Sequence, residues 1–233
     1  METGKSKRTM IVSISLGGSL LTREPIPETF RKYAGVLRRL KERGHTLIVV
    51  CGGGKPARDW IGLAKELGAD AYTQDRLGVH ATHLNALLLI AALGPDAHPH
   101  VHRRGSEVKH NLGDRILVGG GHLPGSSTDY RAVLFAEAAG ADLIVNATDV
   151  DGVYDKNPKK HSDAIKLKHI TYSQLETIIL NNAEQKPGEY GLFDLKAVRR
   201  AKKLKIPVIF IDGTDHEEIL RAVQGTHGGT EIC

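Results

Sequence analysis

The stretch that decides the fold is LIVVCGGGK, residues 47–55, in which an apolar run meets three consecutive glycines. A short apolar run that ends at a turn is typical of a strand buried on both faces. Three glycines between a strand and a helix leave backbone N–H groups accessible in a concave turn, which is what phosphate binding requires. The stretch therefore predicts a phosphate-binding turn.

Basic side chains follow this turn, at the start of a helix expected over residues 57–67. Lys55 and Arg58 would stand near the positive end of the helix dipole, where cations are unfavourable unless an anion lies beside them. Neither the P-loop pattern GxxxxGKS/T nor the dinucleotide pattern GxGxxG fits these residues. We therefore expect an anion site that belongs to neither a P-loop NTPase nor a Rossmann dehydrogenase.

Glycines end two further expected strands. Residues 10–16 run into GGS at 17–19, and residues 115–118 run into GGG at 119–121. Strands are also expected at 143–147 and 207–211, with helices at 28–43, 57–67, 82–93, 129–139, 172–181 and 195–204. Apolar strands that alternate with helices predict an α/β fold, a mostly parallel central sheet covered by helices on both sides. Such sheets bind ligands at the carboxyl ends of their strands, where the glycine turns would gather.

The third glycine turn leads into PGSSTD, residues 124–129. Its hydroxyls, on Ser126, Ser127 and Thr128, can bind an anion at the start of a helix. Asp129 fits an N-cap, which contributes about 1 kcal/mol, or a carboxylate that aligns basic groups around a transferred phosphoryl group. The later stretch ATDVDGVYDKNPKK, residues 147–160, lacks the spacing of a calcium loop and is interpreted as a nucleotide-edge loop.

Composition restricts the class of protein. The 233 residues are 40% hydrophobic and 25% charged, with a formal charge of +5, as in a soluble globular chain with a small phosphorylated partner. No nucleic-acid-binding motif is present, so no nucleic acid is expected. Cys51 and Cys233 support neither a disulfide framework nor a zinc site and predict a cytoplasmic protein. No apolar run comes near the roughly 20 residues of a membrane helix, so no membrane partner is expected. Residues 1–9 are expected to form a flexible basic tail before a single domain, 10–233.

Taken together, GGS at 17, GGGKPAR at 52, PGSSTD at 124 and ATDVDGVYDKNPKK at 147 resemble the amino acid kinase superfamily, and within it the archaeal type of UMP kinase. The resemblance covers nearly the whole chain from Ile11. It implies a three-layer α/β/α sandwich that transfers the γ-phosphoryl group of ATP to UMP, a step of pyrimidine nucleotide biosynthesis, with Mg2+ on the ATP. It also implies a homohexamer, a trimer of dimers, for which the apolar helix 82–93 would supply contacts.

Motif by motif, the resemblance assigns residues to two substrates and to catalysis. Those near ATP would be Gly18, Ser19, Gly54, Arg58, Thr148, Tyr154 and Asn157. Those near UMP would be Gly53, Asp75, His122, Leu123, Pro124, Gly125, Ser126, Ser127 and Thr128, with Asp75 on the ribose hydroxyls. Lys55 and Arg58 would balance the charge on the transferred group, and Asp129 would organise the basic groups. No metal ligand is assigned to the protein.

Three positions depart from the family pattern. Ser15 stands where many members carry a lysine, so Lys55 is expected to supply the missing charge. Arg199 takes a lysine position in DLKAVR, residues 194–199. Asn157 replaces an acidic residue of some relatives.

Two alternatives stay open. Within the superfamily the acceptor could be a carboxylate, a carbamate or isopentenyl phosphate, although KPAR at 55–58 in place of a histidine favours UMP. From another class, a non-catalytic nucleotide-binding or metal-binding protein would use the histidine-rich stretch 98–110, with possible ligands His98, His100, His102 and His110. We expect that stretch to be an exposed loop with solvated histidines.

Overall fold

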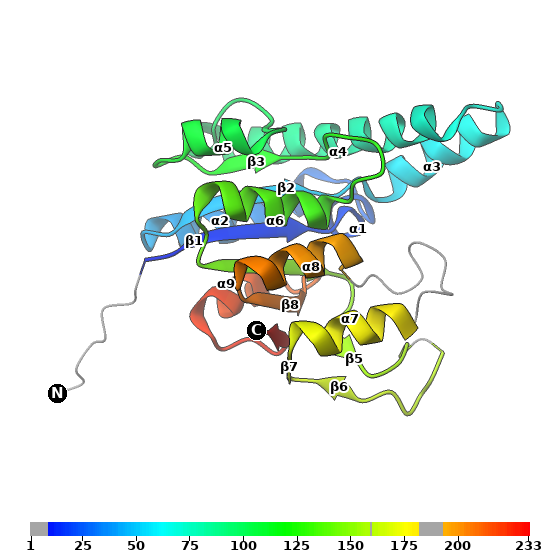
Figure 1. The fold of residues 1–233 in the computed structure, drawn as a ribbon. Helices are drawn as coiled ribbons and strands as arrows, with labels where there is room; N and C mark the ends of the chain where they lie inside the picture. Colours follow the sequence, from blue (N-terminus) through cyan, green and yellow to red (C-terminus); the bar gives the residue numbers. More distant parts are fainter. Residues whose placement is uncertain (1–8, 159, 182–192) are drawn as a thin grey trace.

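The fold is that of a computed structural model, which describes residues 9–158, 160–181 and 193–233. Nearly all of the expected tail, residues 1–9, lies outside the described residues. A central sheet runs through the molecule, with helices in front of it and behind it (Figure 1). This is the α/β sandwich expected from the alternation of strands and helices.

The central sheet has seven strands in the order β3-β2-β1-β4-β8-β9-β7. All neighbours are parallel except β8 and β9, which pair antiparallel. Its strands are β1 Ile11–Leu16, β2 Thr46–Cys51, β3 Leu117–Gly119, β4 Leu143–Thr148, β7 His169–Ile170, β8 Val208–Asp212 and β9 Thr230–Ile232. The three strands that end on glycine turns are therefore neighbours at one edge of the sheet.

The helices lie in two layers, each built on one set of alternating strand residues. One layer, α1, α2, α4 and α9, packs on Val12, Ile14 and their counterparts. The other, α5 to α8, packs on the opposite face. The helices are α1 Gly18–Thr22, α2 Pro27–Glu42, α3 Gly54–Glu66, α4 Ala71–Leu93, α5 Gly105–Asn111, α6 Thr128–Ala139, α7 Tyr172–Asn181, α8 Leu195–Leu204 and α9 Glu217–Gln224. Ser13 and Ser15 are the polar positions of β1, and both face α6.

Several elements were not expected from the sequence. The expected helix 82–93 is the second half of α4, which begins at Ala71 after the cap residue Asp70. The structure also contains elements that the sequence did not predict: helices α1 and α9, strand β9, and a small antiparallel sheet of β5 (Val153–Tyr154) and β6 (Lys166–Leu167).

The histidine-rich stretch 98–110 is not simply an exposed loop, as was expected. Its end forms most of α5, and His102 is 2% exposed. The imidazole donates from Nδ1 to the carbonyl of Val118 at 3.1 Å and faces the amide of Asn111 at Nε2. Within the described part of the chain, no group of three or more His, Cys, Asp or Glu is arranged to hold a metal ion. The metal-binding alternative therefore has no preformed site there.

One described segment, Ala71–Asp96, has the length and hydropathy of a membrane-spanning helix, so the expectation that no apolar run approaches that length is wrong. This segment is α4 with the short 3-10 turn Gly94–Asp96. In the fold, α4 packs against α2, α3 and strands β2 and β3. That packing gives a second explanation for its apolar composition.

Candidate functional site

The three glycine turns meet because their strands are adjacent and parallel. The turn after β1 is so close to the turn after β2 that a Cβ on Gly18 would lie 2.1 Å from the Gly54 nitrogen. Thr22, at the end of α1, fixes this contact: its hydroxyl donates to the Gly18 carbonyl at 2.8 Å and accepts from the Lys55 amide at 3.0 Å. Only glycine permits such an approach of two backbones.

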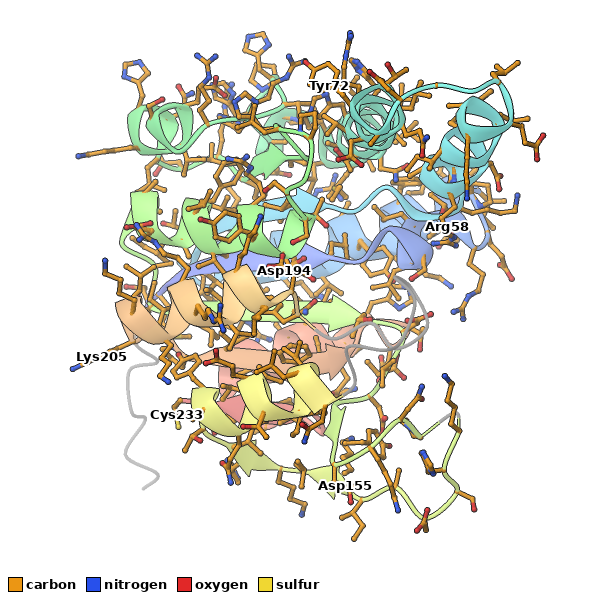
Figure 2. The ribbon with its side chains drawn as sticks, turned by 45° about the vertical axis from the view of Figure 1, so that its right-hand side comes forward. Arg58, Tyr72, Asp155, Asp194, Lys205 and Cys233 are labelled. Atoms are coloured by element: carbon orange, nitrogen blue, oxygen red, sulfur yellow. The ribbon has the colours of Figure 1, made fainter. Side chains whose placement is uncertain are left out.

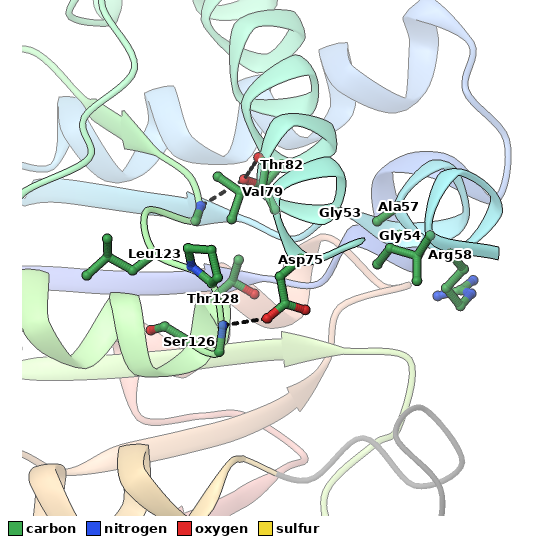
Figure 3. A pocket seen from close by; sticks show the side chains of 15 residues that line it. Gly53, Gly54, Ala57, Arg58, Asp75, Val79, Thr82, Leu123, Ser126 and Thr128 are labelled. Carbon is green, nitrogen blue, oxygen red and sulfur yellow. Dashed lines mark hydrogen bonds between the residues drawn. The ribbon is translucent and has the colours of Figure 1, made fainter. Parts of the chain in front are cut away.

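A cleft of about 640 Å³ opens beside these turns, between α3, α4 and the loop that precedes α6 (Figure 3). It contains most of the residues that the sequence assigned to the acceptor nucleotide. The lining residues so assigned are Gly53, Asp75, Leu123, Pro124, Gly125, Ser126 and Thr128. Gly54 and Arg58, which were assigned to ATP, line the same cleft. Arg58 lies on the side of the molecule away from α8 and the C-terminus (Figure 2).

Asp75 joins two sides of this cleft. It projects from the first half of α4 toward the loop before α6, and its Oδ2 accepts a hydrogen bond of 2.6 Å from the Gly125 amide (Figure 3). Gly125 has φ +73°, a conformation that favours glycine. The carboxylate is exposed, so its second oxygen is accessible to a ligand in the cleft.

His122 and Ser127 do not line the cleft. Ser127 caps α6, since its Oγ accepts from the Tyr130 amide at 2.9 Å, and it also bonds Asp194. His122 is partly buried beside Arg131, and burial followed by that positive charge lowers its pKa. These two residues are placed to support the loop that lines the cleft.

Asp129 lies behind the loop, where its Oδ1 accepts a 2.6 Å hydrogen bond from the Ser15 hydroxyl. Removal of the carboxyl from water, with the nearby charge of Asp194, raises its pKa to about 6, although the Ser15 bond opposes this shift. Asp129 follows the cap residue Ser127 by two positions, so it is not itself the N-cap. Its carboxyl can therefore titrate near neutral pH at the base of the site.

The two basic residues of α3 differ in their surroundings. Arg58 lines the cleft and has no ion-pair partner within the described residues. Lys55 lies outside the lining: its ammonium pairs with Asp59 at 2.5 Å on the exposed side of the helix. This placement favours Arg58 over Lys55 as the cation that faces a bound phosphate.

The residues assigned to ATP are spread over a wider area. Thr148 ends β4 next to the first turn, where the Gly17 amide donates to the Ala147 carbonyl at 2.9 Å. Ser19 opens toward a second, smaller pocket beside α2. Tyr154 lies on β5 and donates to Asp151 at 2.9 Å, whereas Asn157 is 1% exposed. Thr148 thus lies beside Gly17, in the same turn as Gly18, but no cleft within the described residues unites it with Tyr154 and Asn157.

Thr82 is a cleft residue that the sequence analysis missed. Its hydroxyl accepts from the Gly121 amide at 2.8 Å and donates to the Val79 carbonyl at 2.6 Å (Figure 3). A threonine inside an apolar helix gave no signal of this contact. Only its spacing of seven residues from Asp75, two turns along the same face, could have indicated it.

Comparison with known proteins identifies relatives over nearly the whole chain. The profile of the amino acid kinase family matches residues 10–212. The uridylate kinase of Methanothermobacter thermautotrophicus is 41% identical over 224 residues, which are 96% of this chain and 99% of that protein. The uridylate kinase of Methanobrevibacter smithii is 37% identical over the same length, with the same shares covered.

A solved structure shares the fold over nearly the whole chain. The crystal structure of uridylate kinase from Archaeoglobus fulgidus superposes with a TM-score of 0.85 at 38% identity, covering 96% of this chain and 100% of that one. The similarity includes both halves of the sheet, so the cleft lies in a shared framework.

Proposed function

The chain belongs to the amino acid kinase family, and from this we propose that it is a UMP kinase, which transfers the γ-phosphoryl group of ATP to UMP to give UDP and ADP. The observation that carries the proposal is the cleft in which Asp75 and the loop 121–128 face the Gly53–Gly54 turn. A phosphate-binding turn opposite a carboxylate that can bind a ribose fits a nucleoside monophosphate. The relatives named uridylate kinase support UMP as that nucleotide.

UMP would lie in the cleft with its phosphate at the glycine turn. Asp75 would accept hydrogen bonds from the ribose hydroxyls through the oxygen that Gly125 leaves accessible. Leu123, Pro124 and Ser126 would enclose the nucleotide from the loop side. His122 and Ser127 would act through that loop.

ATP would approach from the other side of the Gly18 turn. Gly18, Ser19 and Thr148 would contact its phosphates, while Tyr154 and Asn157 would belong to the region of the adenosine. Gly54 and Arg58 lie between the two nucleotides, where the phosphoryl group passes.

Phosphoryl transfer goes through a loose transition state, so the protein chiefly positions the reactants and stabilises charge. Arg58 would hold the oxygens of the transferred group with its planar fork. The amides of the glycine turns would donate to the same oxygens. Asp129 would organise the base of the site, and Lys55 would contribute only by leaving Asp59.

Mg2+ would enter on the phosphates of ATP. Phosphate oxygens and water would supply most of its ligands, as is usual for Mg2+ in sites that bind nucleotides. When bound, it would neutralise part of the phosphate charge. It would need no dedicated protein cage.

The decisive experiment is incubation of the protein with ATP, Mg2+ and UMP, followed by chromatography for UDP. Isopentenyl phosphate, carbamate and an amino acid carboxylate serve as competing acceptors at equal concentration. UDP formation with a preference for UMP is the expected result. Turnover of another acceptor alone would contradict the substrate, and turnover of none would favour a non-catalytic binding protein.

The chain would form a homo-oligomer through α3 and α4. Both helices expose apolar stripes, with side chains about half exposed: Trp60, Leu63, Leu84, Leu87 and Leu88. Several large apolar side chains exposed on neighbouring helices favour an interaction site. We propose a hexamer built as a trimer of dimers. We also propose a cytoplasmic location, which is in keeping with two unpaired cysteines. Leu87→Glu tests the contact, because a charge on this surface should disfavour association. Light scattering should then give a smaller mass for the variant in solution than for the wild type.

A further inference from the structure

Helix α4 carries three buried polar side chains in its apolar second half. Thr82, His83 and Asn85 are 6%, 8% and 4% exposed. Buried polar groups destabilise a fold unless they are hydrogen bonded. All three bind backbone atoms of the glycine turns that end β2 and β3, so the helix connects both turns.

Asn85 determines the direction of two peptides in the turn after β2. Its Nδ2 donates to the Gly52 carbonyl at 2.7 Å and to the Gly53 carbonyl at 3.3 Å. In a trans peptide the C=O and N–H bonds point in opposite directions. The N–H groups of Gly53 and Gly54, which belong to these two peptides, are therefore directed away from Asn85. Among the described residues neither has an acceptor.

Thr82 and His83 hold the peptide groups of Gly121 from both sides. Thr82 accepts from the Gly121 amide at 2.8 Å, and His83 Nε2 lies 2.7 Å from the Gly121 carbonyl. A carbonyl only accepts, so Nε2 carries the proton. Burial lowers the pKa of His83, which favours the neutral ring. Gly120 allows this approach, because a Cβ there would lie 2.6 Å from the Thr82 hydroxyl.

We propose that Asn85, Thr82 and His83 are positioning residues, which orient the peptides of two glycine turns for phosphoryl transfer. Asn85 directs the free N–H groups of Gly53 and Gly54 toward the phosphoryl group as it passes between the nucleotides. Thr82 and His83 keep Gly121 at the wall of the UMP cleft. The inference rests on the proposed function. It predicts that a change of Asn85 lowers kcat, whereas a change of Thr82 or His83 raises the KM for UMP.

Asn85→Asp tests the first part. The substitution replaces the donating amide nitrogen with a carboxylate oxygen, which repels the two carbonyl oxygens. The peptides should lose their orientation, although the side chain keeps its size. We expect kcat to fall at least tenfold at a temperature where the variant is folded. Leu89→Ala is the matched control, since it opens a cavity in the core of the same helix and lowers Tm without touching a glycine turn. Equal losses of kcat in the two variants would overturn the assignment of Asn85.

Thr82→Val tests the second part and does not depend on the folding of the first variant. It removes the acceptor for the Gly121 amide and keeps the shape of the side chain. The KM for UMP should rise at least fivefold with kcat nearly unchanged, and Thr82→Ser, which restores the hydroxyl, should recover it. An unchanged KM in the valine variant, or no recovery in the serine variant, would contradict the role.

Binding of pyrophosphate separates this inference from the proposed function. Calorimetric titration reports on the Gly53 and Gly54 amides without any turnover. If the wild type forms no UDP, the proposed function fails, and the titration alone decides the inference. At least tenfold weaker binding by Asn85→Asp supports it, whereas equal binding, or none by the wild type, overturns it.

Discussion

The hydroxyl of Ser15 donates to the carboxyl of Asp129 at 2.6 Å, across 114 residues of sequence. Ser15 is a polar position of β1 that faces α6, and Asp129 lies in the first turn of that helix. By the family resemblance, a lysine would be expected at the place of this serine. In this chain the carboxyl thus has a neutral partner, and its pKa is raised to about 6 in place of the lowered value that a cation would produce.

Asp129 makes stability depend on pH. Its pKa is about 6 in the folded protein against 3.8 ordinarily, so the folded state binds the proton more tightly. The resulting stabilisation is complete below about pH 4 and is lost as the pH rises through 6. Asp129→Asn keeps an acceptor for Ser15 and cannot ionise. At pH 8 we expect it to be more stable than the wild type, by on the order of 3 kcal/mol in urea unfolding.

The same measurement at pH 4 provides the control. There the wild-type carboxyl is protonated, and the two proteins should unfold at nearly the same urea concentration. A constant difference at both pH values would mean that the substitution acts through packing and that the carboxyl is not perturbed.

The sequence predicted the layers and the meeting of the glycine turns because those features depend on local patterns. Apolar strands such as residues 47–51 and their following glycines place the ligand edge without any long-range information. The first half of α4 was missed because residues 71–81 lack an apolar repeat. Its stability comes from the Asp70 cap and packing on α3, and only the cap has a local signal.

For the site, most residues that the sequence assigned to the acceptor nucleotide line one cleft, but the sequence did not predict their contacts. Asp75 lies 50 residues from Gly125, and no local rule pairs them. His102 was interpreted as solvated because histidines in a polar stretch usually are. Its ring is in fact buried, and it forms a hydrogen bond with the Val118 carbonyl. The partner of Lys55 is a local pair at i and i+4, which could have been predicted from Asp59.

Arg58 should matter more to catalysis than Lys55. Arg58→Ala removes a cation that lines the cleft, and we expect kcat/KM for UMP to fall roughly 100-fold or more. Lys55→Ala should cost less than about tenfold, because its ammonium already pairs with Asp59. Steady-state kinetics of both variants measures the two losses. Asp59→Asn, which removes the ion-pair partner of Lys55, is measured beside them. A larger loss for Lys55→Ala would restore the assignment made from the sequence.

Asp75 should distinguish the two nucleotides. Asp75→Ala removes the carboxylate at the proposed ribose site and the support of the Gly125 amide, so the KM for UMP should rise by roughly tenfold or more. The KM for ATP should change little. Initial rates with each substrate varied in turn provide the measurement.

Asp70→Ala is the matched control on the same helix. It removes the cap of α4, a bond to the Thr73 amide, and should lower stability without changing either KM. Equal increases in both KM values for Asp75→Ala would contradict the ribose assignment.

Gly18 should tolerate no side chain, whereas Gly35 should. A Cβ on Gly18 would lie 2.1 Å from the Gly54 nitrogen and 2.6 Å from the Gly52 carbonyl carbon, so backbone would have to move. We expect Gly18→Ala to destabilise the fold by about 3 kcal/mol or more and to abolish activity by separating the two turns. Gly35 lies inside α2, where a Cβ would have nothing within 4 Å, and Gly35→Ala should stabilise by up to about 1 kcal/mol. Thermal unfolding of the two variants measures both effects, and a Gly18→Ala protein as stable as the wild type would mean that the turns are not in contact.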